Sequence, residues 1–165
     1  MDKVTRHRHA WGGLLAVGTL LAPVTAWAVP MPTTTIVVVA GDLVPDSNGS
    51  FTGFDRPALN DAGQASFFAE LTGTSGGNSD NSGIFRGSGG VLTQIVRKGQ
   101  PAPDANGSFA SFNGLVLNDA GQVAFVDSLV GTSGGIFDNN GIFRGDGGAL
   151  TQIAREGQAA PDANG

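Results

Sequence analysis

The side chains of this chain that could do chemistry are mostly carboxylates and amides in two short loops. Asp80 and Asn81 stand shortly before a glycine, and Asp138 and Asn139 occupy the same place 58 residues later. Ca²⁺ prefers several oxygen ligands, and an acidic loop bounded by glycine can supply them. These four residues are therefore the candidate calcium ligands. The alternative is a solvated turn rich in Asn and Asp, since two apolar residues interrupt the second loop and no bidentate Glu follows.

Composition excludes most other catalytic chemistry. Histidine occurs only as His7 and His9, and the chain has no cysteine and no tyrosine. Residues beyond 28 therefore cannot support Ser-His-Asp or Cys-His catalysis. Classical zinc, haem and iron–sulfur sites are excluded on the same grounds. We predict no cofactor, with calcium as the one alternative.

Paired carboxylates are the remaining route to catalysis, as in glycoside hydrolysis. The chain has only two glutamates, Glu70 and Glu156, and neither has an acidic counterpart 58 residues away. Three aspartates do recur at this spacing, whereas an active site normally occurs once. We therefore predict no catalytic residues and no enzyme, with a carboxylate-dependent glycan hydrolase or lyase as a distant alternative. The recurring acids are Asp46/Asp104, Asp61/Asp119 and Asp80/Asp138.

A tandem repeat positions these residues. Residues 45–102 align with residues 103–160 without a gap, and 37 of the 58 paired positions are identical. Residues 161–165 match the start of a third copy, which we expect to be truncated. A fixed period of this size indicates that one supersecondary unit is stacked on the next.

Each repeat is expected to form four short strands. Gly and Pro punctuate the repeats every few residues, and no segment keeps the apolar period of a helix. Turns of Asn, Asp and Gly separate the runs and favour hairpins. A unit of this kind matches the blade of a β-propeller. The expected strands cover residues 51–60, 64–71, 83–86 and 91–97 in the first repeat, and 109–118, 122–129, 141–144 and 149–155 in the second.

The predicted fold class is all-β, with two four-stranded antiparallel propeller-type blades forming an incomplete ring. Residues 29–44 are expected to add a lead-in strand, because Thr35–Gly41 aligns with Thr93–Gly99 on the fourth strand of the first repeat. Two blades do not close a propeller ring. We therefore expect a fragment of a longer protein, or assembly with further repeats or other copies of itself.

Two pairs of arginines recur on the expected strands, Arg86/Arg144 and Arg97/Arg155. An arginine of this kind usually pairs with an acid while its stem covers apolar surface. We predict such a pairing with an acid of the next blade. The alternative is a clamp for an anionic ligand.

The N-terminus is typical of a secretory signal peptide. Lys3, Arg6 and Arg8 precede an apolar stretch over residues 10–24, and Ala26-Trp27-Ala28 fits the cleavage pattern. We expect a signal helix over residues 1–28 that is cleaved after Ala28, with an uncleaved anchor as the alternative. The protein would then be secreted or held at the cell surface, with no membrane span after cleavage.

The exported chain would have 137 residues and a net charge of −7. Nucleic acids and anionic membranes are recognised by clustered Lys and Arg, so we predict no nucleic-acid partner. An extracellular glycan or protein is the partner class that fits export.

A short motif in each repeat resembles a known family. Asn-x-x-Gly-x-x-Ser/Ala-Phe occurs at residues 60–67 and 118–125, with Ser66 where Ala is expected. It is similar to the Asn-x-x-Gly-x-x-Ala-Phe tandem repeat of bacterial exported proteins that carry a choice of C-terminal anchors. The resemblance implies a β-propeller-like exported repeat protein without catalytic residues. The matched motif positions, predicted to be structural, are Asn60, Gly63, Phe67, Asn118, Gly121, Ala124 and Phe125.

The sequence thus predicts a non-catalytic exported or cell-surface repeat protein that acts as a structural or interaction module of β-propeller type. A propeller that binds a glycan or calcium is the alternative.

Overall fold

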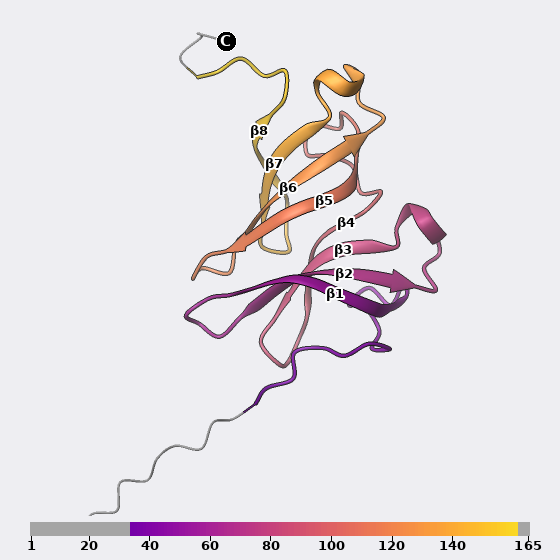
Figure 1. Ribbon diagram of the computed structural model, residues 1–165, viewed down its shortest axis with the longest axis vertical. Helices are drawn as coiled ribbons and strands as arrows, with labels where there is room; N and C mark the ends of the chain where they lie inside the picture. The colour runs from indigo at the N-terminus through magenta and orange to yellow at the C-terminus, as the bar shows by residue number, and fades with distance from the viewer. Residues whose placement is uncertain (1–33, 162–165) are drawn as a thin grey trace, which may run out of the picture. The chain divides into compact units, whose positions relative to one another are not determined.

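The computed structural model describes residues 34–161 of the chain. The expected signal helix, the start of the lead-in segment and residues 162–165 lie outside this range. Within it, regular structure consists of β-strands and two short 3₁₀ helices (Figure 1). No helix in this part of the chain is long and apolar enough to span a membrane.

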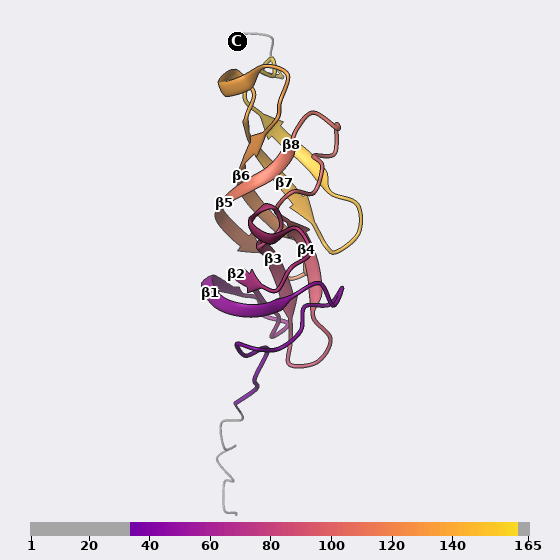
Figure 2. The ribbon, with the colours of Figure 1, turned by 90° about the vertical axis from the view of Figure 1, so that its right-hand side faces the viewer.

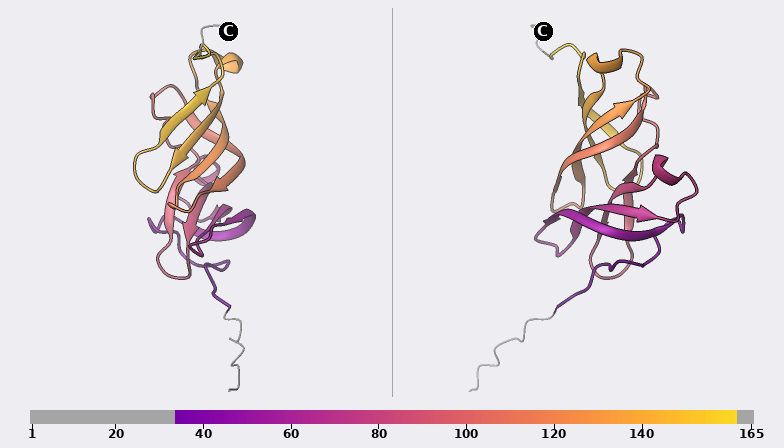
Figure 3. Two further views of the ribbon diagram at one scale, coloured as in Figure 1. Left: turned by 90° about the vertical axis from the view of Figure 1, so that its left-hand side faces the viewer. Right: turned by 45° about the vertical axis from the view of Figure 1, so that its right-hand side comes forward.

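The eight strands form two separate antiparallel sheets of four strands each, and the strands follow sequence order. Neither sheet closes on itself (Figures 2 and 3). The expected all-β class with two four-stranded sheets is therefore confirmed. The first sheet contains β1 (Ser50–Leu59), β2 (Ala65–Thr72), β3 (Ser82–Gly87) and β4 (Thr93–Arg97). The second contains β5 (Ser108–Leu117), β6 (Val123–Val130), β7 (Asn140–Gly145) and β8 (Thr151–Arg155).

The connections explain why the turn residues recur. Gly63 and Gly121 close the β1–β2 and β5–β6 hairpins with φ of +74° and +79°, a conformation that other L-residues rarely adopt. The longer β2–β3 and β6–β7 connections each contain one 3₁₀ turn, η1 (Gly77–Ser79) and η2 (Gly135–Phe137). These connections return the chain to the same end of each sheet.

The described part of the lead-in segment, residues 34–44, is not a strand, contrary to expectation. Residues 34–42 have no strand pairing, and Leu43 forms only an isolated bridge with Ser50. A strand needs a hydrogen-bonded neighbour, and the described residues place no strand of the β3 type beside this segment. Val37 and Val38 nevertheless pack against the core of the first sheet. They align with Ile95 and Val96 of β4 in the repeat.

Three phenylalanines form the centre of each sheet's core. In the first sheet Phe51 meets Phe85 edge to face, with ring centroids 4.9 Å apart, and Phe67 packs against both. Phe109, Phe143 and Phe125 repeat this arrangement in the second sheet, and the Phe109–Phe143 centroid distance is also 4.9 Å. The motif residues Phe67 and Phe125, predicted to be structural, are both buried.

The second sheet also covers one face of the first. Ile84 of β3 and Val96 of β4 are fully buried in a single cluster with Phe109, Phe125 and other residues of the second repeat. At the edge of this cluster Phe68 contacts Phe112, with ring centroids 6.2 Å apart. This cluster is a shared core that joins one face of the first sheet to the second sheet, whereas Phe51, Phe67 and Phe85 belong to a separate cluster.

Candidate functional site

A buried arginine at the end of the first sheet's last strand binds the loop that precedes its first strand and the β2–β3 connection. Arg97, at the end of β4, donates from Nη1 to Asp46 Oδ2 at 2.9 Å, from Nη2 to Asn48 O at 2.6 Å and from Nε to Asp80 O at 2.8 Å. The Asn48 amide donates to Asp80 Oδ2 at 2.9 Å. We call Arg97, Asp46, Asn48 and Asp80 the first arginine clasp.

The second repeat builds the same arrangement from the matching residues. Arg155 donates to Asp104 Oδ2 at 2.7 Å, to Asn106 O at 2.6 Å and to Asp138 O at 2.7 Å. The Asn106 amide donates to Asp138 Oδ2 at 2.9 Å. Arg155, Asp104, Asn106 and Asp138 are the second arginine clasp, so the recurring acids Asp46/Asp104 and Asp80/Asp138 have a structural role in each unit.

The clasps correct the predicted partners of Arg97 and Arg155. Both arginines pair with acids of their own repeat and not with an acid of the next one. The reason is topological, because the loop that enters the first strand, the β2–β3 connection and the end of β4 all meet at one end of the sheet. Such a meeting of segments up to 51 residues apart is set by the fold.

Of the calcium candidates, Asp80 and Asp138 lie in the clasps and Asn81 and Asn139 directly follow them in the sequence. Their surroundings do not suit a cation. Asp80 Oδ2 accepts hydrogen bonds from Asn48 and from the Gly76 N–H, and it lies 3.8 Å from the Arg97 guanidinium. Asn81 Oδ1 accepts from the Lys98 ammonium at 3.3 Å. Asp138 repeats the Asp80 contacts, and Asn139 Oδ1 accepts from the Asn140 amide. No cluster of three metal-ligating acids or histidines occurs among residues 34–161.

Hydrogen bonding lowers the pKa of one carboxylate in each clasp. The pKa of Asp80 lies below its ordinary value, chiefly because of a hydrogen bond from the Thr74 hydroxyl, with the Asn48, Gly76 and Arg97 donors adding to it. The Thr74 hydroxyl also lies 3.0 Å from Gly77 O. The pKa of Asp138 is lowered in the same way, first by the Thr132 hydroxyl.

The Asn-x-x-Gly turns connect one sheet to the other. Asn60 closes its own turn by accepting from Gln64 N at 2.8 Å, and its amide donates to Asn118 O in the next turn at 2.9 Å. Asp61 N donates to Asp119 Oδ1 at 3.1 Å, which gives this recurring acid a structural contact. The motif residue Asn60 thus serves both its own hairpin and the stacking of the repeats.

We expect Asn60→Ala to lower the free energy of unfolding by about 2 kcal/mol, because it removes two bonds within the turn and one inter-sheet bond from a buried site. Asn118→Ala is the matched control, since exposed Asn118 makes the same bonds within its turn and none to a further turn in the described structure. Asn118→Ala should lower the free energy of unfolding by about 1 kcal/mol less than Asn60→Ala does, as measured by urea denaturation. Equal losses would contradict an inter-sheet role for Asn60.

Arg86 reaches the next repeat, but through carbonyls and not through an acid. Its guanidinium donates to Gly121 O, in the β5–β6 turn, and to Asp146 O at 3.3 Å. Its counterpart Arg144 is exposed and makes no hydrogen bond within residues 34–161. The predicted acid partners of both arginines are therefore absent from the described structure.

Asp127 is a feature that our sequence analysis missed. It is completely buried on β6 and accepts hydrogen bonds from Ala110 N at 3.1 Å and Ser111 N at 2.8 Å, where β5 bulges. Burial raises its pKa to about 6, against the opposing effect of these bonds. The signal was present, because Val123, Phe125 and Leu129 alternate with it on a core-facing strand, where an acid is out of place.

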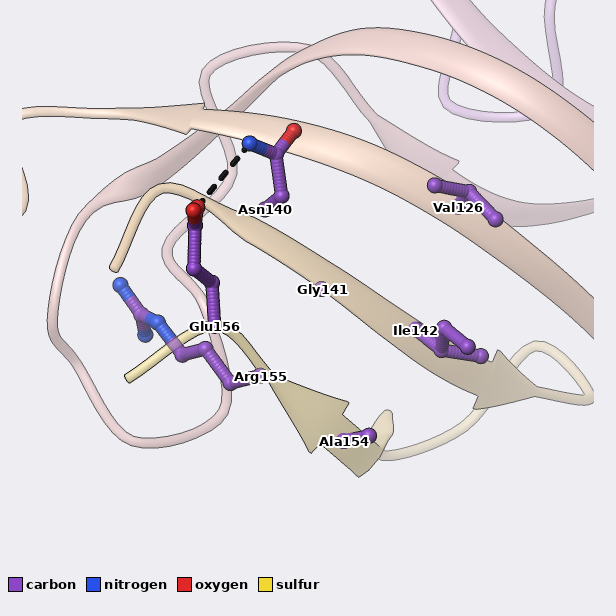
Figure 4. Close-up of a pocket in the computed structure, with 7 residues that line it drawn as sticks. All are labelled: Val126, Asn140, Gly141, Ile142, Ala154, Arg155 and Glu156. Carbon is purple, nitrogen blue, oxygen red and sulfur yellow. Dashed lines mark hydrogen bonds between the residues drawn. The ribbon is translucent and has the colours of Figure 1, made fainter. Parts of the chain in front are cut away.

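The second sheet leaves one face uncovered. Val126, Ile142 and Ala154 lie on three neighbouring strands around a shallow hollow (Figure 4). Val126 is 40% exposed and Ile142 43%, whereas Ile84, the counterpart of Ile142 in the first sheet, is fully buried. The motif residue Ala124 lies on this face too, and its counterpart Ser66 is fully buried. We call Val126, Ile142, Ala154 and Arg144 the uncovered face.

The predicted site residues thus fall into two groups. The motif residues lie at the stacked turns and in the cores, except Ala124 on the uncovered face, whereas the calcium candidates lie in the clasps or next to them in the sequence. A search of the curated proteins found no match, and neither did a search of the solved structures. One family model matches residues 23–165, and on this match the chain belongs to the DUF7453 family, a family of unknown function.

Proposed function

We propose that this protein is a non-catalytic, exported repeat module that serves as a scaffold outside the cell or at its surface. The observation that carries the proposal is the use of the recurring charged residues. Asp46, Asp80 and Arg97 bind one another in the first clasp, and the second clasp repeats these bonds. Side chains held in this way are not free to act on a substrate.

The proposed architecture is of β-propeller type. Each unit is a four-stranded antiparallel sheet whose strands follow sequence order, and the second sheet packs face to face with residues of the first. Val37 and Val38 stand where a fourth strand of a preceding unit would pack. Together with the Asn-x-x-Gly-x-x-Ala-Phe motif, this supports kinship with the exported tandem-repeat proteins that the motif resembles.

The experiment that tests the proposal expresses the chain with its own N-terminus in a bacterial host that exports proteins. We expect the exported protein to begin at Val29, as read by N-terminal sequencing, because cleavage follows Ala28. The exported protein should release no reducing ends from a panel of polysaccharides. Retention inside the cell would contradict the export, and turnover that is lost in Asp119→Ala would contradict the non-catalytic role.

A further inference from the structure

The interface between the two sheets predicts how an additional unit would bind. On the first sheet, Ile84 and Val96 are fully buried beneath the second repeat, and Arg86 donates to the carbonyl of Gly121. The corresponding positions of the second sheet are occupied by Ile142, Ala154 and Arg144, and all three are exposed. Ile153 is 53% exposed, whereas its counterpart Ile95 is 3% exposed.

The opposite end of the molecule carries the other half of this interface. Phe112 and Leu117 of the second repeat pack against the shared core. Their counterparts in the first repeat, Phe54 and Leu59, are 43% and 74% exposed. The molecule therefore presents both halves of its own internal interface, one at each end.

We propose that the uncovered face of β6, β7 and β8 binds the first repeat of a second copy of this chain, in a head-to-tail contact. Ile142 then packs against Phe54 and Leu59 of the next copy, as Ile84 packs within the shared core. Arg144 donates to the carbonyl of Gly63 of that copy, as Arg86 donates to Gly121. The Asn118 amide donates to Asn60 O of that copy, as the Asn60 amide donates to Asn118 O within the chain.

A second copy is the favoured occupant because the contact continues an interface that the molecule already contains. The apolar residue Ile84 recurs as Ile142, and Arg86 recurs as Arg144. The acceptor turn also recurs, as Asn-Asp-Ala-Gly at residues 60–63 and 118–121. The first repeat of another copy supplies both the Gly63 carbonyl for Arg144 and the apolar pair Phe54 and Leu59 for Ile142. An unrelated partner has no reason to present these groups at the same spacing.

The lead-in segment competes for part of this contact. Val37 and Val38 already cover the place on the first sheet that Ile153 and Ala154 of another copy would take. Because residues 34–38 have no strand partner, only side-chain packing holds them there, and displacement breaks no ladder of backbone hydrogen bonds. Association is therefore expected to be weak and to depend on protein concentration.

The contact is heterologous, so it joins unlike ends and can extend beyond two copies. This distinguishes it from a symmetric dimer, in which one patch meets itself. A variant altered at one end only keeps the other end intact. Two such variants, each blocked at a different end, should therefore complement each other.

The test measures the oligomeric state of the purified chain by sedimentation velocity over a range of concentrations. Native protein should form dimers and larger species as its concentration rises. Ile142→Asp and Leu59→Asp should each weaken self-association by about tenfold or more. Both side chains are substantially exposed, so the fold should tolerate the changes. An equimolar mixture of the two variants should form a one-to-one dimer that grows no further.

Ile136→Asn is the matched control, because Ile136 is 72% exposed in η2, away from the uncovered face, and the first repeat has Asn78 at this position. It should associate like the native protein. A native chain that stays monomeric would overturn the proposal, and so would variants that do not complement each other. The inference rests on the proposed scaffold role, but its failure would leave export and the lack of turnover unaffected.

Discussion

Arg97→Ala should lower the free energy of unfolding by about 3 kcal/mol, since removing one partner of a buried ion pair leaves its other groups unmatched. Arg97 is 5% exposed and supplies the donors for Asp46, for Asn48 O and for Asp80 O. This value is at the lower end of the range for breaking a buried ion pair, because the Asp46 side chain is 43% exposed and can be hydrated again. The measurement is the urea midpoint, at an unchanged denaturant slope.

Arg144→Ala is the matched control for this change. Arg144 is also an arginine on a strand, but it is exposed and has no hydrogen bond in the described structure. At a concentration where the chain is monomeric, its replacement should alter the free energy of unfolding by about 0.5 kcal/mol or less. Arg97→Lys should fall between the two, because an ammonium group cannot serve the same forked set of acceptors. Equal midpoints for Arg97→Ala and Arg144→Ala would contradict the clasp.

The second large effect is a fall in stability with rising pH that depends on Asp127. Its pKa rises from 3.8 to about 6 on folding, so the native state holds the proton more tightly than the unfolded chain. Below the lower value both states are protonated and there is no penalty. As the pH rises through about 6, the free energy of unfolding should fall by up to about 3 kcal/mol, at 1.36 kcal/mol for each unit of pKa.

Asp80 and Asp138 act in the opposite direction and at lower pH. The pKa values of Asp80 and Asp138 are lowered by folding, so their contribution is present above 3.8 and is lost as the pH falls through the folded pKa. The loss that comes from Asp80 and Asp138 therefore occurs below the pH range in which Asp127 lowers the stability. Few proteins that depend on paired carboxylates would be expected to lose stability between pH 4 and pH 6.

Denaturation of Asp127→Ala across this pH range isolates the effect. The first sheet has Ala69 at the same buried position, so the strand geometry accepts alanine there. In this variant the free energy of unfolding should change little between pH 4 and pH 6, whatever its absolute value. Asp127→Asn should behave likewise, because the amide does not titrate. A slope that persists in both variants would show that another group is responsible.

The sequence alone was sufficient for features that depend on neighbouring residues. The glycines at Gly63 and Gly121 mark the hairpin turns because a positive φ is a local demand. The alternation of Phe67 and Leu71 identifies the core face of β2 because successive strand residues point to opposite sides. The repeat period then places the second sheet once the first is known.

The lead-in segment shows where such local reasoning fails. Thr35–Gly41 has the pattern of β4, and Val37 and Val38 make the corresponding side-chain contacts. Whether they form a strand depends on a hydrogen-bonded neighbour, which no local pattern can supply. The segment therefore packs like a strand without being one.

The sequence by itself determined the all-β class, the turns, the structural role of the motif residues Phe67 and Phe125, and the exclusion of His- and Cys-based chemistry beyond residue 28. Only the tertiary structure decided what the charged residues do. Arg97 meets Asp46 across 51 residues, and Asn60 meets Asn118 across 58. Asp127 finds its two donors at a bulge of another strand. Strand and turn formation depends on residues that are adjacent in the sequence, whereas the partner of a long polar side chain depends on which chain segments the fold brings together.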